Sequence, residues 1–501
     1  MRINKIIIVG GGTSGWFTAT TLAYKFPRLD ITLIESREIP TIGVGESTLN
    51  HINYFFNVLD LEDNEWMKEC DATYKASIEF ENFYKNGTRF QYPFGFISTP
   101  PNLDSGVGIY SVDEWFNLKS VYPNEIKAED FVNYFSFNGL LANYNRMANE
   151  EVYNFSFKRD IAYHFDAEKF AKFLQKKYCA NVTHYIATIE DVGVSENGIE
   201  YVRVDDNKLT ADLYIDCSGF NSLLIEQKLK VPFIEFESLI NDSAIAARIP
   251  YNEKETIRNT TLCTAVDNGW IWNIPLWNRY GSGYVFSSKF ADFDSIENEF
   301  RKKTSYEGDI KRISFRHGYH EKAFYKNVYT VGLSYGFIEP LESTGLLTVH
   351  ENILALITLL GKHDCHINNI DKEMLNYFCE TYIRNMSDFV GYHYAFSKKD
   401  DTDYWNEVTN NISYNPIDLY QDILSNKKYN TFGGLLFILI GMNYSPTSID
   451  DLKWLISLKS KTLYEYKIKL NSYKNILKKQ KENILKYPSH LEFLKQKIYR
   501  T

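Results

Sequence analysis

KIIIVGGGTSG, residues 5–15, opens the chain with a short apolar run followed at once by a glycine-rich turn. The run at residues 6–9 predicts a buried strand, and the glycines after it match the spacing of a strand–turn–helix dinucleotide fingerprint. In that fingerprint Gly10 permits the tight turn, Gly12 lets the backbone approach a pyrophosphate, and Gly15 lets helix and strand pack closely. Because backbone N–H groups at a helix start are unpaired, they can face the phosphates.

An acidic residue follows at the distance that this fingerprint requires. Glu35 ends a second apolar run, residues 31–34, twenty residues after Gly15. Its carboxylate can accept hydrogen bonds from an adenosine ribose. A glycine pattern alone is weak evidence, since loops produce such spacings by chance, but here strand, helix and acid agree. The sequence therefore predicts an α/β, Rossmann-like nucleotide-binding fold. At this point the cofactor can be either a flavin or a nicotinamide dinucleotide.

The rest of the chain indicates a discontinuous arrangement. Strands of the nucleotide domain are expected to return at residues 213–216 and 328–332. Residues 251–288 are rich in aromatic and β-branched residues and predict a sheet, which we expect to form a wall of a ligand cavity. From residue 344 onward, apolar residues recur at helical spacing, and the lysine-rich stretch 453–500 predicts a solvated amphipathic helix. We expect a cofactor-binding core at residues 1–80 and 150–350, and a mostly helical substrate-binding module at residues 81–149 and 351–501.

Composition limits the classes of function. The chain has 55 basic and 64 acidic side chains and a net charge of −9, which argues against nucleic acid as the main partner because phosphate backbones are bound by a positive field. Its six cysteines are scattered without a CxxC pair, so we predict no metal site and no disulfide framework, and a reducing cytoplasm fits best. We expect no signal peptide and no membrane association, since the apolar runs are too short.

Residues 269–275, GWIWNIP, carry two tryptophans one residue apart. On a strand, Trp270 and Trp272 point to the same face, where their indoles can form an apolar wall that keeps water from a reactive intermediate. Taken alone, this pair is explained equally well by ordinary core packing.

Together with other motifs, this segment resembles the flavin-dependent halogenases of the tryptophan halogenase family. Residues 270–275 match the WxWxIP motif of that family, residues 10–16 match its GxGxxG flavin motif, and Lys75 falls where the family carries its essential lysine. The similarity runs in unchanged order over residues 3–405. It includes residues 40–46, 164–167, 216–219, 281–288, 339–345 and 400–402.

The resemblance implies an FAD-binding fold of the flavin monooxygenase type, with an antiparallel sheet wall and a mostly helical C-terminal substrate module. It implies that reduced FAD, oxygen and a halide ion yield hypohalous acid, which travels through the protein to an aromatic substrate of the indole or phenol type. Since no second glycine-rich motif is evident for NAD(P)H, a separate flavin reductase is expected to supply reduced FAD.

The resemblance also assigns roles to individual residues. Lys75 would receive the hypohalous acid, either by donating hydrogen bonds to it or by forming a haloamine. Glu342 would polarise the oxidant and stabilise positive charge on the ring. Thr344 and Gly345 would offer backbone N–H groups to the halide. Contacts with FAD would come from Gly10, Gly12, Thr13, Ser14, Gly15, Glu35, Ser36, Glu46, Ile189, Leu333 and Leu346.

The predicted substrate pocket departs from that of family members that act on free tryptophan. Tyr92 falls where those enzymes have a histidine, Phe94 is retained, and Leu435 and Leu436 replace tyrosines of the lid. A more apolar lid lacks hydroxyls for a carboxylate or ammonium group, so free tryptophan is not the expected substrate. The pocket is assigned to Tyr92, Phe94, Trp270, Trp272, Leu435 and Leu436.

Two other interpretations stay open at this point. The first is a flavin-dependent aromatic hydroxylase or related oxidoreductase, because fold does not dictate chemistry. The second is a non-catalytic flavin-binding protein. Lys75 together with the two tryptophans favours the halogenase. His164 is expected to be a structural histidine beside the flavin rather than a general base, and a homo-oligomer is compatible with the sequence.

Overall fold

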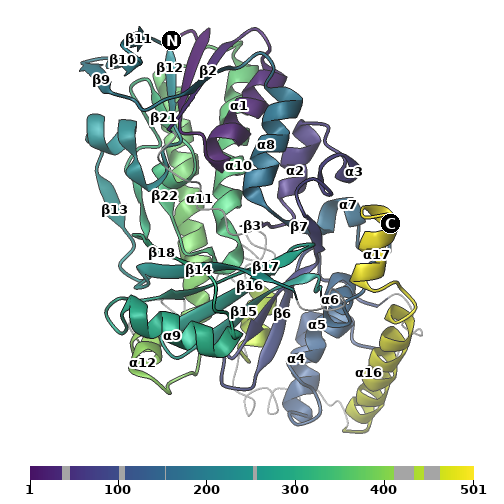
Figure 1. The fold of residues 1–501 in the computed structure, drawn as a ribbon. Helices are drawn as coiled ribbons and strands as arrows, with labels where there is room; N and C mark the ends of the chain where they lie inside the picture. Colours follow the sequence, from purple (N-terminus) through teal and green to yellow (C-terminus); the bar gives the residue numbers. More distant parts are fainter. Residues whose placement is uncertain are drawn as a thin grey trace. The chain divides into compact units, whose positions relative to one another are not determined.

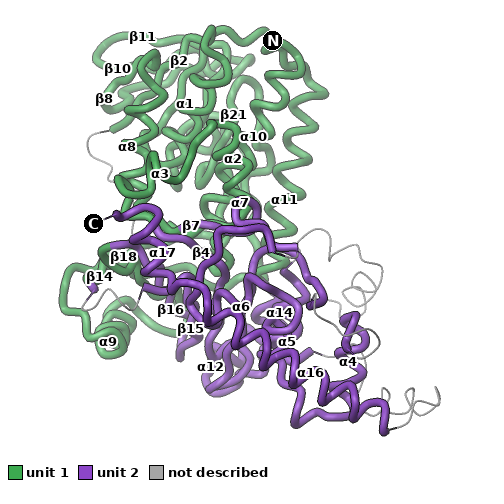
Figure 2. Tube along the Cα trace, turned by 90° about the vertical axis from the view of Figure 1, so that its right-hand side faces the viewer, with its two compact units in different colours: residues 1–72, 164–250, 278–390 green, residues 73–163, 251–277, 391–501 purple. Residues whose placement is uncertain are grey.

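The computed structural model describes residues 1–36, 46–100, 108–152, 154–251, 257–410, 434–444 and 463–500. Contacts divide the chain into two compact units, coloured separately in Figure 2. Unit 1 comprises residues 1–72, 164–250 and 278–390, and unit 2 comprises residues 73–163, 251–277 and 391–501. These units are defined by packing, so the predicted division into a cofactor-binding core and a substrate module stays a prediction.

The main sheet of unit 1 has the strand order β20-β21-β12-β1-β2-β8. Its strands are β1 (Lys5–Val9), β2 (Asp30–Glu35), β8 (Thr183–Ile186), β12 (Leu213–Asp216), β20 (Phe324–Tyr325) and β21 (Val328–Thr330). Neighbouring strands are parallel, except for the antiparallel pair β20 and β21. The two predicted late strands therefore pair beside β1, which confirms the discontinuous α/β fold.

Helix α1 (Thr13–Lys25) packs against α8 (Ala167–Tyr178) and α10 (Thr344–Lys362) (Figure 1). Residues 15–23 of α1 are all buried, as expected for a helix covered on every side. Among the described helices, α10 is long and apolar enough to cross a membrane by length and composition, and 61% of that window is buried. Its contact with α1 identifies it as a core helix of unit 1.

Smaller elements complete unit 1. The two-residue strand β3 (Glu46–Ser47) pairs antiparallel with the last two residues of β7 (Ala162–Phe165). The other elements are α2 (Ile52–Val58), α3 (Asp63–Trp66), β9 (Asp191–Ser195), β10 (Gly198–Val204), β11 (Asn207–Leu209), β13 (Phe233–Glu235), β14 (Ser243–Pro250), β17 (Arg279–Phe286), α9 (Phe293–Thr304), β18 (Ile310–Ser314), β19 (Gly318–His320), β22 (Gly336–Phe337) and most of α11 (Asn369–Ala395).

Four strands of unit 2 pair in the order β16-β15-β5-β6. They are β5 (Ser77–Glu81), β6 (Arg89–Pro93), β15 (Thr260–Val266) and β16 (Gly269–Pro275). The hairpin partners β15 and β16, and likewise β5 and β6, are antiparallel, whereas β5 and β15 are parallel because a long connection joins them. The sheet predicted over residues 251–288 is confirmed, with one parallel pair; residues 252–256 lie outside the described part.

The described remainder of unit 2 is mostly helical, as predicted for the C-terminal part of the chain. Its elements are β4 (Thr73–Lys75), α4 (Val112–Val121), α5 (Asp130–Phe135), α6 (Phe137–Asn143), α7 (Phe157–Asp160), α12 (Asp403–Asn410), α14 (Leu435–Gly441), α16 (Leu463–Ile484) and α17 (His490–Lys497). In α16, Tyr466, Leu470 and Tyr473 are buried, which confirms the amphipathic helix. Residues 453–462 of that predicted helix lie outside the described residues.

Candidate active site

The glycine-rich turn between β1 and α1 has the geometry that a dinucleotide fingerprint requires. Gly10 has φ of +115°, which L side chains rarely adopt. A Cβ on Gly15 would overlap the carbonyl oxygen of Gly10, so α1 can approach this closely only with glycine there. A Cβ on Gly12 would meet no heavy atom within 4 Å. The turn thus has open space at Gly12, as the predicted pyrophosphate contact requires, while FAD binding itself stays a prediction.

Glu35 covers one side of this turn. A Cβ on Gly11 would overlap the Glu35 side chain, so glycine at that position lets the carboxylate lie over the turn. Glu35 Oε1 also lies 2.9 Å from His184 Nε2, on the neighbouring strand β8. Sequence reasoning found Glu35 but missed His184, because a histidine on a distant strand carries no local signal. The pair holds the carboxylate beside the turn, where a ribose acceptor is needed.

Two further predicted flavin residues lie next to Glu35. The hydroxyl of Ser36 is 3.4 Å from that of Thr188, and the Ala187 N–H donates to the Glu35 carbonyl oxygen at 2.9 Å. Ile189 follows directly and packs, partly buried, against the apolar cluster that includes Ile7 and Ile34. The structure therefore brings residues 35–36 and Ile189 together at the end of β2.

Helix α10 and the segment before it also reach the turn. A Cβ on Gly332 would overlap Ser14 Oγ and would lie 3.1 Å from Val349 on α10. Leu333 directly follows Gly332, and Leu346 is buried in the first turn of α10. The segments that carry these two predicted flavin residues therefore adjoin the turn that contains Ser14.

Glu342, the carboxylate predicted to be catalytic, lies just before α10. Glu342 ends a short 3-10 turn (Pro340–Glu342) and is completely buried. The next residue, Ser343, has a left-handed φ of 59°, and its hydroxyl donates to Ser47 Oγ at 3.0 Å. That hydrogen bond brings the segment of Glu342 to the segment of Glu46, which are almost three hundred residues apart in the sequence.

The start of α10 can accept a small anion. Thr344 Oγ1 is buried and has no hydrogen-bond partner among the described residues. A Cβ on Gly345 would meet no heavy atom within 4 Å. First-turn N–H groups lack intrahelical partners and attract negative charge. These features fit the predicted halide contacts of Thr344 and Gly345, and halide binding stays a prediction.

Glu46 begins β3 and is half-buried; residues 40–45 of the same matched segment lie outside the described residues. Loss of hydration and, second, the negative charge of Asp166 raise the pKa of Glu46 to about 7. His164, predicted to be a structural histidine beside the flavin, is completely buried on β7, in register with Ser47. Glu46 is therefore expected to stay protonated in the folded protein under mildly acidic conditions.

This raised pKa predicts a pH-dependent loss of stability. In the unfolded chain Glu46 ionises near pH 4.5, so between about pH 4.5 and pH 7 the folded state holds the extra proton and stability falls as pH rises. The substitution Glu46→Gln should be nearly neutral at pH 4 and should raise the free energy of unfolding at pH 8 by ~3 kcal/mol. Urea denaturation of both proteins at the two pH values measures this, and an equal difference at both would contradict it.

Unit 2 holds the predicted catalytic lysine. Lys75 ends β4, is 0% exposed, and its Nζ lies 5.0 Å from the centre of the Phe94 ring. Lysines are almost never fully buried in an ordinary structural position. The face of an aromatic ring stabilises a nearby ammonium group. The burial and the aromatic contact thus distinguish Lys75 from a surface lysine.

The tryptophan motif lies on β16 in the same unit. The ring centroids of Trp270 and Trp272 are 6.0 Å apart, and both side chains are buried, which confirms that they share a face. Thr73, on the strand of Lys75, donates from Oγ1 to the Pro275 carbonyl oxygen at 2.5 Å. β4 is therefore tied to the end of the strand that carries the two tryptophans.

The remaining predicted pocket residues meet at β6 and α14. The rings of Tyr92 and Phe94 are 5.7 Å apart in an edge-to-face arrangement. A Cβ on Gly434 would overlap the Tyr92 ring, so α14 starts directly against Tyr92. Leu435 and Leu436 follow in that first turn and are both buried. The structure brings these residues together in unit 2, while their contact with substrate stays a prediction.

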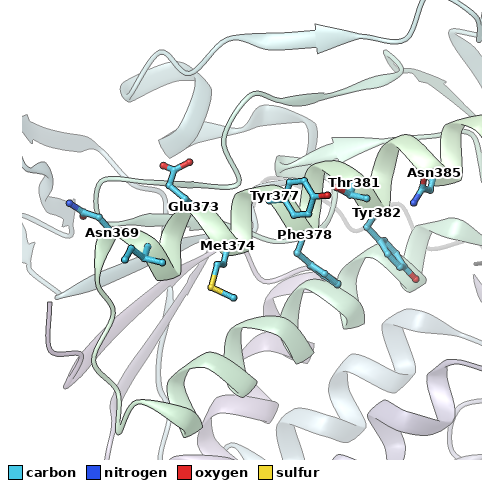
Figure 3. A pocket seen from close by; sticks show the side chains of 9 residues that line it. Asn369, Glu373, Met374, Tyr377, Phe378, Thr381, Tyr382 and Asn385 are labelled. Carbon is cyan, nitrogen blue, oxygen red and sulfur yellow. The ribbon is translucent and has the colours of Figure 1, made fainter.

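A hollow of ≈ 760 Å³ lies elsewhere, along α11 (Figure 3). Its lining side chains all come from that helix: Asn369, Ile370, Glu373, Met374, Tyr377, Phe378, Thr381, Tyr382 and Asn385. It is open and contains none of the residues singled out in the sequence. Among the described residues that line it, Glu373 carries the carboxylate, and none of the predicted site residues contributes to it. Among the described residues, no group of three or more His, Cys, Asp or Glu side chains could hold a metal ion.

Known proteins resemble this chain over nearly its whole length. A sequence model of the tryptophan halogenase family matches residues 5–452. The tryptophan 7-halogenase RebH of Lentzea aerocolonigenes is 34% identical over 426 residues, which cover 81% of this chain and 78% of RebH. The solved structure of VirX1 has 38% identity and a TM-score of 0.92, covering 99% of this chain and 100% of VirX1. Xcc4156, a flavin-dependent halogenase from Xanthomonas campestris, has 25% identity and a TM-score of 0.84, covering 99% of both chains. The chain therefore belongs to the tryptophan halogenase family, the flavin-dependent enzymes that halogenate aromatic substrates.

Proposed function

We propose that this enzyme passes hypohalous acid to Lys75, from which electrophilic halogen reaches an aromatic C–H group. The overall reaction consumes reduced FAD, O₂, halide, a proton and the arene, and it releases oxidised FAD, the aryl halide and two molecules of water. The observation that supports this role is the completely buried Lys75, with its Nζ 5.0 Å from the Phe94 ring.

Residues of unit 1 would hold the cofactor and the halide. The open space at Gly12 would take the pyrophosphate, and Glu35 would accept hydrogen bonds from the ribose. When bound, reduced FAD supplies the electrons with which O₂ oxidises the halide to hypohalous acid. Thr344 and Gly345 would hold the halide, and the buried carboxylate of Glu342 would polarise the oxidant.

Lys75 can act on hypohalous acid in two ways. As an ammonium, it would donate a hydrogen bond to the oxygen, which makes hydroxide a better leaving group when the ring attacks the halogen. As a neutral amine, it would replace one N–H by N–halogen and release water. In both cases the ring carbon forms a bond to halogen, the halogen–oxygen or halogen–nitrogen bond breaks, and the ring loses a proton.

The proposed substrate is an indole, phenol or larger aromatic compound rather than free tryptophan. At the start of α14, Leu435 and Leu436 are buried and carry no hydroxyl group. Without hydroxyl groups at these two described positions, the site loses partners that could hold the amino-acid end of tryptophan. We also propose that a separate reductase supplies reduced FAD, and that the six scattered cysteines suit a cytoplasmic location.

A substrate panel tests the activity and its class. Each arene is incubated with FAD, a flavin reductase, NADH, O₂ and chloride, bromide or iodide, and the products are analysed by mass spectrometry. We expect halogenated products that disappear when halide is omitted. A product that gains oxygen instead would indicate the hydroxylase, and absence of any product over the whole panel would indicate a non-catalytic flavin-binding protein.

The same panel tests the substrate class. In competition, simple indoles and phenols are expected to exceed free tryptophan in kcat/KM by about 10-fold or more, because Leu435 and Leu436 offer no hydroxyl group to the charged ends of the amino acid. Indole and tryptophan form a matched pair that differs only in those charged ends and their linker. Clear preference for tryptophan would contradict the proposed substrate class without affecting the proposed chemistry.

A further inference from the structure

Asn138, near the start of α6, is buried and bonds to three separate segments of unit 2. Its Nδ2 donates to the backbone carbonyl oxygens of Ala76 at 2.9 Å, Phe94 at 3.1 Å and Asp160 at 3.0 Å. An amide NH₂ has two hydrogens, so three acceptors use its full donor capacity with one hydrogen shared. The opposite orientation of the amide would place its oxygen against three carbonyl oxygens, which settles the assignment.

Two of these carbonyl groups belong to residues that adjoin Lys75, one along the chain and the other through a side-chain contact. Ala76 is the residue directly after Lys75, and the Phe94 ring is the one that contacts the Lys75 Nζ. The Phe94 N–H also donates to the Ala76 carbonyl oxygen at 3.2 Å. On the other side, the Ala76 N–H donates to the Asn259 carbonyl oxygen at 2.8 Å. Ala76, the residue after Lys75, is therefore held through both its N–H and its carbonyl group, and Asn138 joins that carbonyl group to the backbone of Phe94.

The start of α6 does not depend on the Asn138 side chain. Ser136 is the N-cap of this helix, and its hydroxyl accepts the Gly139 N–H at 3.0 Å. The Asn138 amide instead donates to Ala76 between β4 and β5, to Phe94 directly after β6, and to Asp160 at the end of α7. A buried amide stabilises a fold only when it is hydrogen-bonded, and loss of the donor leaves its acceptors without that partner. The side chain thus serves the strand junction at Lys75 rather than the helix.

We propose that Asn138 is a positioning residue that fixes the backbone of Lys75 relative to Phe94. This inference rests on the proposed function of Lys75. Without the Asn138 amide, the junction between β4 and β5 can shift against the end of β6. The Lys75 amine then moves relative to the Phe94 ring. A misplacement of about 1 Å in a reacting group lowers the rate by up to ~100-fold.

The test compares Asn138→Ala with Asn143→Ala. Asn143 lies on the same helix, and its Nδ2 donates instead to Asn133 Oδ1 at 2.7 Å. Three quantities are measured: FAD affinity, halogenated arene per molecule of reduced FAD consumed, and hypohalous acid trapped in solution by a β-diketone scavenger. Asn138→Ala should lower the product yield about 10-fold to 100-fold and increase trapped oxidant, with FAD affinity unchanged. Asn143→Ala should leave the product yield unchanged.

A second variant, Asn138→Asp, gives a readout that a purely structural role would not move. The aspartic acid has the same shape, and only its protonated form offers an O–H donor. Its product yield, relative to the wild type at the same pH, should therefore increase when the pH is lowered from 8 to 6. A pH-independent yield in this variant would count against the proposal.

The possible failures can be told apart. If Lys75→Ala keeps full halogenation, the proposed function fails and the positioning role fails with it. If Lys75→Ala abolishes product but Asn138→Ala keeps the wild-type yield, only the positioning role is overturned. If both Asn138 variants lose FAD binding together with the folded state, Asn138 is a general folding residue, and the proposal is equally overturned.

Discussion

Replacing Lys75 with alanine is expected to lower the yield of halogenated product by at least about 100-fold, because the oxidant loses the amine that is proposed to hydrogen-bond to it or to carry the halogen. FAD affinity should be nearly unchanged, since the residues predicted to hold FAD lie in unit 1 and Lys75 lies in unit 2. Single-turnover reactions with pre-reduced FAD, analysed by mass spectrometry, measure the product, and flavin fluorescence measures the affinity.

Lys399 provides a matched control. It is also a buried lysine of unit 2, and its Nζ donates to Asn86 Oδ1 and Asp401 Oδ2, each at 2.7 Å. Lys399→Ala should lower stability but leave the product per folded molecule unchanged. Full halogenation by Lys75→Ala, or equal loss in both variants, would rule out a specific role for Lys75.

The substitution Lys75→Arg separates the two routes at the lysine. Arginine keeps the positive charge and the N–H donors, but it does not form the neutral amine that a haloamine requires. Activity retained within a few-fold in this variant would favour the hydrogen-bonded route. Loss of product with normal FAD affinity would favour the haloamine.

Two alanine substitutions in the glycine-rich turn are expected to differ in their effect on the stability of the FAD-free protein. In Gly15→Ala, the new methyl group overlaps the Gly10 carbonyl oxygen, so α1 must move from β1. We expect a loss of ~3 kcal/mol in the free energy of unfolding, together with loss of FAD binding. In Gly12→Ala, the methyl group meets no protein atom within 4 Å, and the backbone at φ −73° and ψ −171° suits alanine.

Gly12→Ala should therefore change the stability of the FAD-free protein by less than about 0.5 kcal/mol. Its affinity for FAD should nevertheless fall by at least about 10-fold, because the methyl group takes the space proposed for the pyrophosphate. Urea denaturation without FAD and fluorescence titration with FAD measure the two effects. Unchanged FAD affinity in the folded Gly12→Ala protein would refute the placement of the pyrophosphate at this turn.

The nucleotide-binding turn could be predicted from sequence because its causes are local. A positive φ at Gly10 and close helix packing at Gly15 depend on residues within one turn of chain. The late strands β12 and β21 could be predicted as well, since short apolar runs in an α/β pattern favour buried parallel strands. Their parallel register with the sheet of β1 confirms that prediction.

The supporting side chains could not be predicted in this way. Asn138 bonds to carbonyl groups 62, 44 and 22 positions away, and His184 pairs with Glu35 over 149 positions. Neither residue belongs to a motif, and a side-chain bond at such separation leaves no periodic or spacing signal. Compensating substitutions in related sequences could have revealed the Glu35–His184 pair, because both partners are side chains. Asn138 gives no such signal, because its partners are backbone carbonyl groups, which every residue type carries.

The sequence by itself determined the glycine-rich turn, the parallel strands and the helical C-terminal part, because short-range steric demands and apolar periodicity specify them. The family motifs pointed to Lys75, but its isolated sequence position is equally suitable for an exposed lysine. Only the tertiary structure decided that Lys75 is completely buried against Phe94 and that Asn138 holds the adjoining peptide. Burial and such hydrogen bonds arise from the packing of segments that are distant along the chain, and no local pattern encodes that packing.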